Sequence, residues 1–204
     1  MKNDEKIISR IDHVSIAVRD RQKAELFFRD ILGAIAGAGA DDPKAGFFWR
    51  IFSLGDLSRL EIISPMGERS FLDGFLKDRQ GGVHHITLQT PDLSLAMNHL
   101  EARGIPFFGY NEYPGGVWKE IFIHPRDAFG VLIQIAEFTA ADWLAEEVKL
   151  PAPARWQIES TDAGATLRFS HPGGGTVALD LDRTELRRLK ASLEAVLTTD
   201  SPDP

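Results

Sequence analysis

The chain contains the same stretch twice, and a histidine stands at the matching position of each copy. Residues 11–20 read IDHVSIAVRD and residues 83–92 read VHHITLQTPD, which sets His13 against His85 at an offset of 72 positions. A second pair of segments, SRLEIIS at 58–64 and VLIQIAE at 131–137, repeats at nearly the same offset and sets Glu61 against Gln134. The sequence therefore predicts two similar units that bring two polar side chains each to a shared place.

Each unit begins with the pattern of a strand followed by a helix. Residues 11–18 and 83–89 alternate and are rich in β-branched residues, Asp20 and Asp92 are typical N-caps, and a glycine stands after each helical segment. Further strands are expected toward the end of each unit. The predicted elements are helices at 21–32 and 93–103, and strands at 47–54, 59–64, 117–123 and 130–137.

The alternation of side chains along a strand predicts where the four repeated polar residues point. Val14 and Ile16 share one face of the first strand, and His13 lies on the other; the same parity separates His85 from Ile86 and Leu88. Glu61 and Gln134 each stand between two apolar neighbours. All four side chains are therefore expected on the face of the sheet that does not pack against the helices.

Composition narrows the possible chemistry. The 204 residues carry a net charge of −7, which argues against a nucleic-acid partner because phosphate neutralisation needs clustered Lys and Arg. The chain has no cysteine, so a metal would need imidazole, carboxylate or amide ligands. No apolar run approaches the ~20 residues of a membrane helix, and residues 1–10 are too charged for a signal peptide. We expect a cytoplasmic protein without a membrane partner.

Composition shifts along the chain predict three parts. Residues 1–138 form the first domain, with modules at about 10–66 and 82–138, and 139–153 form a helix and a Pro-containing linker. Residues 154–204 have the pattern of three strands and a helix, a βββα extension that ends in a disordered tail. Asp182 and Glu185 are expected to form a capping box at the start of that helix.

The stretches IDHVSIAV (11–18), FLKDRQGGVHHITL (75–88) and IFIHPRDAFGVLIQI (121–135) resemble the vicinal oxygen chelate superfamily. This superfamily includes glyoxalase I, extradiol dioxygenases, bleomycin-resistance proteins and methylmalonyl-CoA epimerases, and the resemblance is closest to the epimerase branch. It implies an α+β fold of paired βαβββ modules whose mixed sheet cups a divalent metal. The resemblance covers about residues 9–138.

Carried over by position, the metal ligands implied by the resemblance are His13, Glu61, His85 and Gln134. One divalent ion (Co, Mn, Ni, Fe or Zn) would have two open positions for substrate oxygens. The family uses the metal to stabilise an enolate while a neighbouring carbon loses a proton. Glu61 and Gln134 are accordingly predicted to be catalytic as well as ligating.

Two positions depart from the epimerase pattern. Gln134 stands where the family usually has Glu, and an amide cannot take up a proton at neutral pH. The epimerases also carry a glutamate base just before the second strand, where this chain has Lys44 or Ala45 and where the nearest acids are Asp41 and Asp42.

Three other residues are candidates for substrate binding. The Gly-rich stretch 109–116 would form a flap near the cavity, so Tyr110 and Tyr113 could contact a small-molecule substrate. Arg126, in the turn HPRD, could meet a phosphate of an acyl-CoA or could be an ordinary exposed arginine.

Three functions agree with the sequence. The first is a metal-dependent epimerase of a short acyl thioester similar to methylmalonyl-CoA, and the second is a glyoxalase-type lyase or isomerase. The third is a protein of the same fold that binds a small ligand without turning it over. Paired modules often pack through dimers, so a homodimer is expected.

Overall fold

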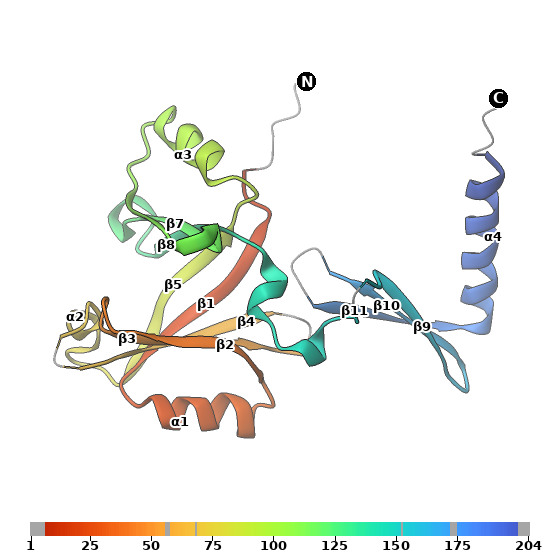
Figure 1. Cartoon of the computed structure of the whole chain (residues 1–204), viewed down its shortest axis with the longest axis horizontal. Coiled ribbons are helices and arrows are strands. Elements are labelled where there is room, and N and C mark those ends of the chain that lie inside the picture. Colours follow the sequence, from red (N-terminus) through yellow and green to blue (C-terminus); the bar gives the residue numbers. More distant parts are fainter. Residues whose placement is uncertain (1–6, 56–57, 68, 152, 172–174, 200–204) are drawn as a thin grey trace. The chain divides into compact units, whose positions relative to one another are not determined.

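The computed structural model describes residues 7–55, 58–67, 69–151, 153–171 and 175–199. The chain divides into two compact units, Met1–Ala145 and Glu146–Pro204, and Figure 1 labels the α-helices and all strands except β6. The strands of the first unit are β1 (Arg10–Val18), β2 (Ile35–Asp42), β3 (Phe47–Ser53), β4 (Arg59–Pro65), β5 (Gly81–Gln89), β6 (Phe108–Glu112), β7 (Trp118–Ile123) and β8 (Leu132–Phe138). Its helices are α1 (Arg21–Leu26), which continues as the π-helical turn η1 (Phe27–Ile31), then α2 (Leu72–Leu76) and α3 (Leu93–Glu101), with the 3-10 turns η2 (Pro114–Gly116), η3 (Pro125–Asp127) and η4 (Ala140–Trp143).

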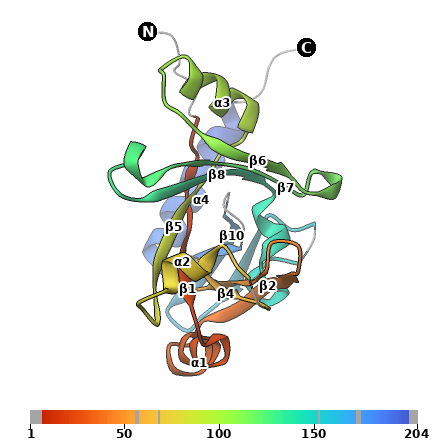
Figure 2. The ribbon, with the colours of Figure 1, turned by 90° about the vertical axis from the view of Figure 1, so that its left-hand side faces the viewer.

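The eight strands form one mixed sheet in the order β2-β3-β4-β1-β5-β8-β7-β6. The order is symmetric about the antiparallel pair β1 and β5, and each of these strands pairs in parallel with the last strand of its own module. The sheet is curled, with β2–β4 and β6–β8 on opposite sides of the central pair (Figure 2). These observations confirm the predicted paired βαβββ modules and cupped mixed sheet.

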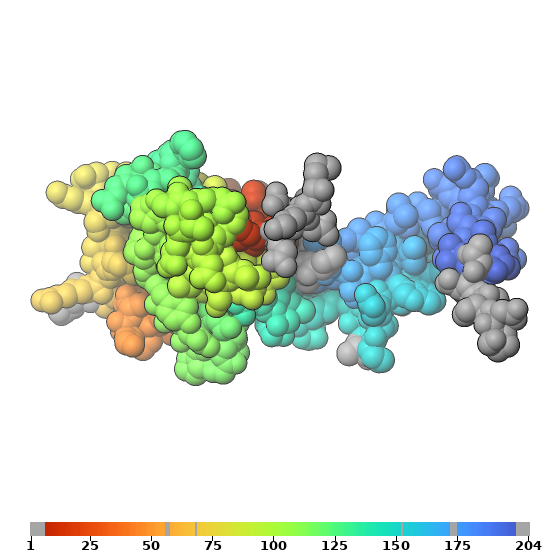
Figure 3. All heavy atoms as spheres, turned by 90° about the horizontal axis from the view of Figure 1, so that it is seen from above, coloured from red at the N-terminus to blue at the C-terminus, as the bar shows by residue number. Residues whose placement is uncertain are grey.

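Helices pack on the outer face of the curled sheet. In the second module, Leu93 and Ala96 of α3 pack against Ile121 and Ile135, and α3 (yellow-green) forms part of the surface seen in Figure 3. In the first module, Phe28 of η1 packs against a cluster that contains Phe52 and Ile62. The apolar residues that flank Glu61 and Gln134 are thereby directed to the helices, which leaves these two polar side chains on the inner face.

Local sequence signals explain where the helices begin and end. The side chains of Asp20 and Asp92 accept hydrogen bonds from the backbone N–H groups of Lys23 and Leu95, as N-caps do. Past the helices, Gly33 (φ 71°) and Gly104 (φ 68°) adopt the left-handed conformation that favours glycine.

Residues 139–150 form two short 3-10 turns, η4 and η5 (Glu146–Val148), where the sequence pattern predicts one helix. Leu144 between the turns has an extended backbone (φ −103°, ψ 150°). Trp143 packs its ring 5.2 Å from that of Trp118 and 5.5 Å from that of Trp49, measured between ring centroids. Packing of this indole against the sheet outweighs the helical periodicity of the segment.

The second unit is a three-stranded antiparallel sheet with a terminal helix, as predicted. Its elements are η5, β9 (Trp156–Ser160), β10 (Gly164–Ser170), β11 (Thr176–Asp182) and α4 (Arg183–Thr199). Asp182 Oδ1 accepts hydrogen bonds from the N–H groups of Thr184 and Glu185, and Glu185 Oε2 accepts one from Asp182 N, which is the predicted capping box. Within the described ranges, no helix is long and apolar enough to cross a membrane.

Candidate metal centre

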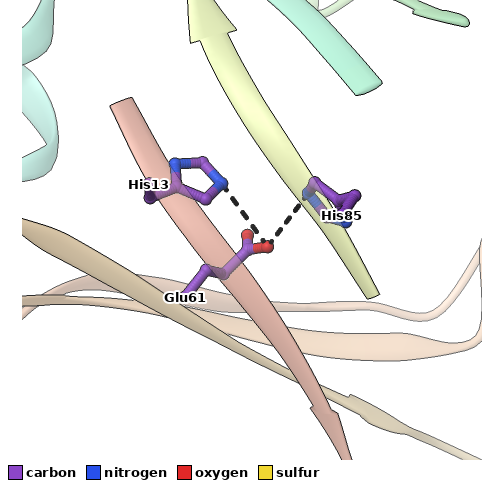
Figure 4. Close-up of side chains that lie close together, drawn as sticks. All are labelled: His13, Glu61 and His85. Atoms are coloured by element: carbon purple, nitrogen blue, oxygen red, sulfur yellow. Dashed lines mark ion pairs between the residues drawn. The ribbon is translucent and has the colours of Figure 1, made fainter. Parts of the chain in front are cut away.

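His13, Glu61 and His85 converge on the inner face of the sheet. They lie on the adjacent strands β1, β4 and β5, and Figure 4 shows the two imidazoles turned toward the Glu61 carboxylate. Glu61 Oε2 lies 3.7 Å from His13 Nε2 and 3.6 Å from His85 Nε2, and one potential ligand atom from each residue lies within 4.8 Å of the others. Three residues that the sequence places more than 20 positions apart therefore form one cluster.

Gln134 reaches the same cluster through Thr87. On β8, Gln134 pairs with Thr87 of β5, which in turn pairs with His13 of β1. The Thr87 hydroxyl donates a hydrogen bond to Gln134 Oε1 (2.5 Å) and lies 2.8 Å from His13 Nε2. The amide oxygen of Gln134 is thus linked through the Thr87 hydroxyl to His13, a member of the cluster.

Burial gives the cluster unusual protonation properties. Desolvation lowers the pKa of His85 to about 3, against the opposing influence of Glu61, so its imidazole is neutral at neutral pH. Burial alone would raise the pKa of Glu61, but the neighbouring imidazoles of His13 and His85, together with Ser15, hold that pKa below its ordinary value. The cluster therefore offers a neutral imidazole beside an ionised carboxylate.

The residue before each histidine orients its ring. Asp12 Oδ2 lies 2.8 Å from His13 Nδ1, and His84 Nδ1 lies 2.9 Å from His85 Nδ1. Asp12 and His84 occupy matching positions of the repeat, so both modules hold the histidine by its Nδ1 atom and leave Nε2 toward the cluster. The His84 ring also packs against Phe75, with centroids 5.0 Å apart.

Asp12 is held in turn by a buried ion pair with Arg59 and by Arg10. The side chains of Asp12 and Arg59 are 2% and 1% exposed. Burial and the neighbouring charge of Arg10 lower the pKa of Arg59 to about 9. The arginine and aspartate form a rigid support behind His13, and this role of Arg59 was not predicted from the sequence.

The residues present fit a divalent cation. His85 Nε2 is buried, and among the described residues it has no hydrogen-bond partner although it points at Glu61. A buried polar atom without a partner is costly, and a cation between His13, Glu61 and His85 would satisfy it. Imidazole, carboxylate and amide oxygen are ligands that first-row divalent metals accept.

Glu120 on β7 is a further buried polar residue of the inner face that sequence reasoning missed. Its Oε2 accepts hydrogen bonds from Gln134 Nε2 (2.6 Å) and Trp118 Nε1 (2.7 Å), and its Oε1 accepts one from Asn111 Nδ2 (3.3 Å). Burial raises the pKa of Glu120, although these three hydrogen bonds act in the opposite direction. A second carboxylate therefore stands next to the candidate ligand Gln134.

Aromatic side chains border the cluster. The Trp118 ring lies 6.5 Å from that of His13 and stacks on Phe138 at 4.3 Å, measured between centroids. Burial raises the pKa of the Tyr113 hydroxyl, and the charges of Glu120, Asp42 and Glu61 raise it further, against a hydrogen bond with Asn111. Two carboxylates of the inner face, Glu120 and Glu61, therefore act electrostatically on the Tyr113 hydroxyl.

The other two predicted substrate residues, Tyr110 and Arg126, are exposed on the first unit. Tyr110 is 55% exposed and donates a hydrogen bond to Glu112 at 3.0 Å. Arg126 is exposed, forms an ion pair with Asp127, and borders a shallow pocket. The pocket is lined by Pro106, Phe107, Phe108, His124, Arg126 and Asp127.

Residues 12–122 match the model of the glyoxalase/bleomycin resistance protein/dioxygenase superfamily. The chain belongs to this superfamily. It is 33% identical over 132 residues to the mitochondrial methylmalonyl-CoA epimerase of Mus musculus, a match that covers 64% of this chain and 74% of the relative. It is 34% identical over 134 residues to the ethylmalonyl-CoA/methylmalonyl-CoA epimerase of Cereibacter sphaeroides, a match that covers 64% of this chain and 99% of that relative. Similarity of this extent to named epimerases indicates that this member of the superfamily is an enzyme.

Solved structures agree with this assignment. The crystal structure of methylmalonyl-CoA epimerase from Mycobacterium tuberculosis superposes with a TM-score of 0.59 and 27% identity, over 65% of this chain and 89% of that chain. A methylmalonyl-CoA epimerase in complex with methylmalonyl-CoA and NH4+ superposes with a TM-score of 0.57 and 25% identity, over 68% of this chain and 99% of that chain. The resemblance to the epimerase branch of the superfamily is therefore confirmed.

Proposed function

We propose that the chain is a divalent-metal-dependent epimerase of a small acyl-CoA thioester of the methylmalonyl-CoA type. The observation that carries the proposal is the buried cluster of His13, Glu61 and His85, with the orphaned His85 Nε2, in a chain related to named epimerases. The reaction removes a proton from the carbon next to the thioester carbonyl, forms an enolate, and returns a proton to the opposite face. No other bond changes, so atoms and charge balance without a co-reactant.

The proposed ligands are His13, Glu61, His85 and the amide oxygen of Gln134. When bound, the cation would supply positive charge to the oxygen on which the enolate charge develops. The low pKa of Glu61 keeps its carboxylate ionised for this role, and the low pKa of His85 keeps the imidazole free to ligate. Gln134 contributes an amide oxygen as a ligand, and this group does not titrate. Of the two residues predicted to be catalytic, Glu61 is therefore charged and Gln134 is neutral.

Asp42 is our candidate for one of the groups that carry the α-proton. Asp42 is the last residue of β2, and its charge and that of Glu61 both raise the pKa of the Tyr113 hydroxyl. Asp41, the other acid of this loop, lies 3.4 Å from Arg21, and its side chain is 56% exposed. Asp42→Asn should slow α-proton exchange by about 100-fold or more, whereas the matched variant Asp41→Asn should leave it within about threefold.

The test of the proposed function combines metal content with proton exchange. Purified protein should hold about one transition metal per chain, and His85→Ala should lose it. With metal, the wild-type protein should exchange the α-proton of methylmalonyl-CoA for deuterium, followed by NMR. Metal binding without exchange would contradict the epimerase; turnover of an α-keto hemithioacetal would then favour a glyoxalase-type enzyme, and no turnover would favour a binding protein.

Arg126 is our candidate contact for the phosphates of coenzyme A, because its exposed guanidinium borders a pocket that a flexible ligand could follow. The sequence predicts that Tyr110 contacts the substrate, and this stays a prediction. In the structure its hydroxyl donates a hydrogen bond to Glu112.

We also propose that the chain forms a homodimer. The second unit exposes Trp156 (63%) and Ile158 (51%) on its sheet and Leu193 (56%) on α4. These side chains stay exposed although α4, which begins at Arg183 directly after β11, contacts β10 and β11. A second copy could cover these side chains, and sedimentation should show a dimer that Leu193→Ser weakens. A monomer at all concentrations would contradict the proposal.

A further inference from the structure

We infer that Glu120 is a positioning residue that fixes the amide of Gln134 with its oxygen toward the His13–Glu61–His85 cluster. The inference rests on the proposed function, because it concerns how Gln134 would meet a cation. It adds a residue outside the four repeated polar positions.

The two ends of the Gln134 amide have different partners. Its Nε2 donates to Glu120 Oε2 at 2.6 Å, and its Oε1 accepts from Thr87 Oγ1 at 2.5 Å. Both oxygens of Glu120 accept hydrogen bonds from side-chain N–H groups, Oε1 from Asn111 and Oε2 from Trp118, so the end of the Gln134 amide that meets Oε2 is the nitrogen. If the amide turned over, two oxygens would stand against each other and the Thr87 hydroxyl would lose its acceptor. Glu120 therefore leaves one orientation available.

Glu120 is itself firmly held. Its Oε2 also accepts from Trp118 Nε1 at 2.7 Å, its other oxygen accepts from Asn111 Nδ2, and the residue is 9% exposed. With the bond from Gln134, three hydrogen bonds hold this side chain in place. The Glu120 carboxylate therefore holds the Gln134 amide in place, as Asp12 holds His13. Partners of this kind orient the ligands of metal sites.

The two modules differ at this position. On the inner face, Glu120 stands two residues before the cross-strand partner of Gln134, and Trp49 stands two residues before the cross-strand partner of Glu61. In the first module the ligand is a carboxylate, which presents an oxygen whichever way it turns. In the second module the ligand is an amide, which presents an oxygen in only one of two orientations. The additional carboxylate is present in the module that needs it.

The experiment is a double-mutant cycle on cobalt affinity. Co²⁺ alone is titrated into metal-free wild-type protein, Glu120→Gln, Gln134→Ala and the double variant, and binding is followed by the visible absorption of the ion. Glu120→Gln should weaken Co²⁺ binding about 10- to 100-fold, because an amide at position 120 can meet either end of Gln134. In the Gln134→Ala background the same change should alter affinity by less than about threefold. Glu101→Gln, the same substitution at the exposed end of α3, should leave affinity unchanged.

The outcomes separate the inference from the proposed function. If wild-type protein binds no Co²⁺, the proposed function and the inference fall together. If wild-type protein binds but Glu120→Gln binds equally well, or if the loss is the same in both backgrounds, only the inference falls. Should Glu120→Gln not fold, as judged by urea unfolding, Asn111→Ala removes one donor from Glu120 and should weaken binding about two- to tenfold; an unchanged affinity would then overturn the inference.

Discussion

Buried His85 should make the first unit less stable as the pH falls below neutrality. Burial lowers the pKa of His85 to about 3, while Glu61 opposes this shift and His13 and His84 add to it. In the unfolded chain the imidazole returns to about 6.5. Between these values the unfolded state binds a proton that the folded state does not, so stability decreases with decreasing pH. For one such group the loss between about pH 7.5 and about pH 5 is ~2 kcal/mol.

The assay is urea unfolding of metal-free protein at these two pH values, followed by tryptophan fluorescence. Three of the four tryptophans lie in the first unit and Trp156 lies in the second, so a Trp156→Phe background restricts the signal to the first unit. His85→Gln should remove about 2 kcal/mol of the pH-dependent loss, whereas His124→Gln, at an exposed histidine, should keep the wild-type difference. Equal losses in wild type and His85→Gln would refute the reasoning.

Three further predictions concern groups around the site. Asp12→Asn should destabilise the first unit by about 3–5 kcal/mol in urea unfolding, because it leaves the charge of Arg59 buried without its partner; a change below about 1 kcal/mol would contradict this. Tyr113→Phe should lower kcat/KM for α-proton exchange about three- to tenfold through loss of the hydroxyl, and an unchanged value would place Tyr113 outside the site. Arg126→Ala should raise KM about two- to fivefold for a CoA thioester in steady-state kinetics but not for a pantetheine thioester; equal effects on both would exclude a phosphate contact.

The internal repeat predicted the arrangement of the first unit because it carried two kinds of information at once. The matching strands at 11–18 and 83–89 predicted two like modules, and strand parity predicted the inner face for the repeated polar side chains. The structure brings His13, Glu61 and His85 together on that face. Both rules depend only on local periodicity, which is the information that a single sequence holds most reliably.

The edge strands and the supporting residues depended on tertiary contacts and were harder to foresee. The segment of β2 reads IAGAGADD, whose Ala and Gly have low strand propensity, and it is a strand because it pairs with β3. Glu120 has no polar counterpart in the first module, so the repeat could not mark it. Asp12 did leave a signal, because a polar residue precedes the histidine in both copies.

The two modules are symmetric in their histidines and asymmetric in what surrounds their oxygen ligands. Strand register places His13 and His85 alike, and each is held through Nδ1 by the preceding residue. At the equivalent inner-face positions, Trp49 packs on Trp143, whereas Glu120 binds Gln134. The two modules therefore have the same strand arrangement but different residues beside their oxygen ligands. This implies that the fold sets the positions of the ligand atoms. The residues on the neighbouring strand determine the charge and orientation of each ligand group. Substitutions at these neighbouring positions should therefore alter the chemistry of the site more readily than its location.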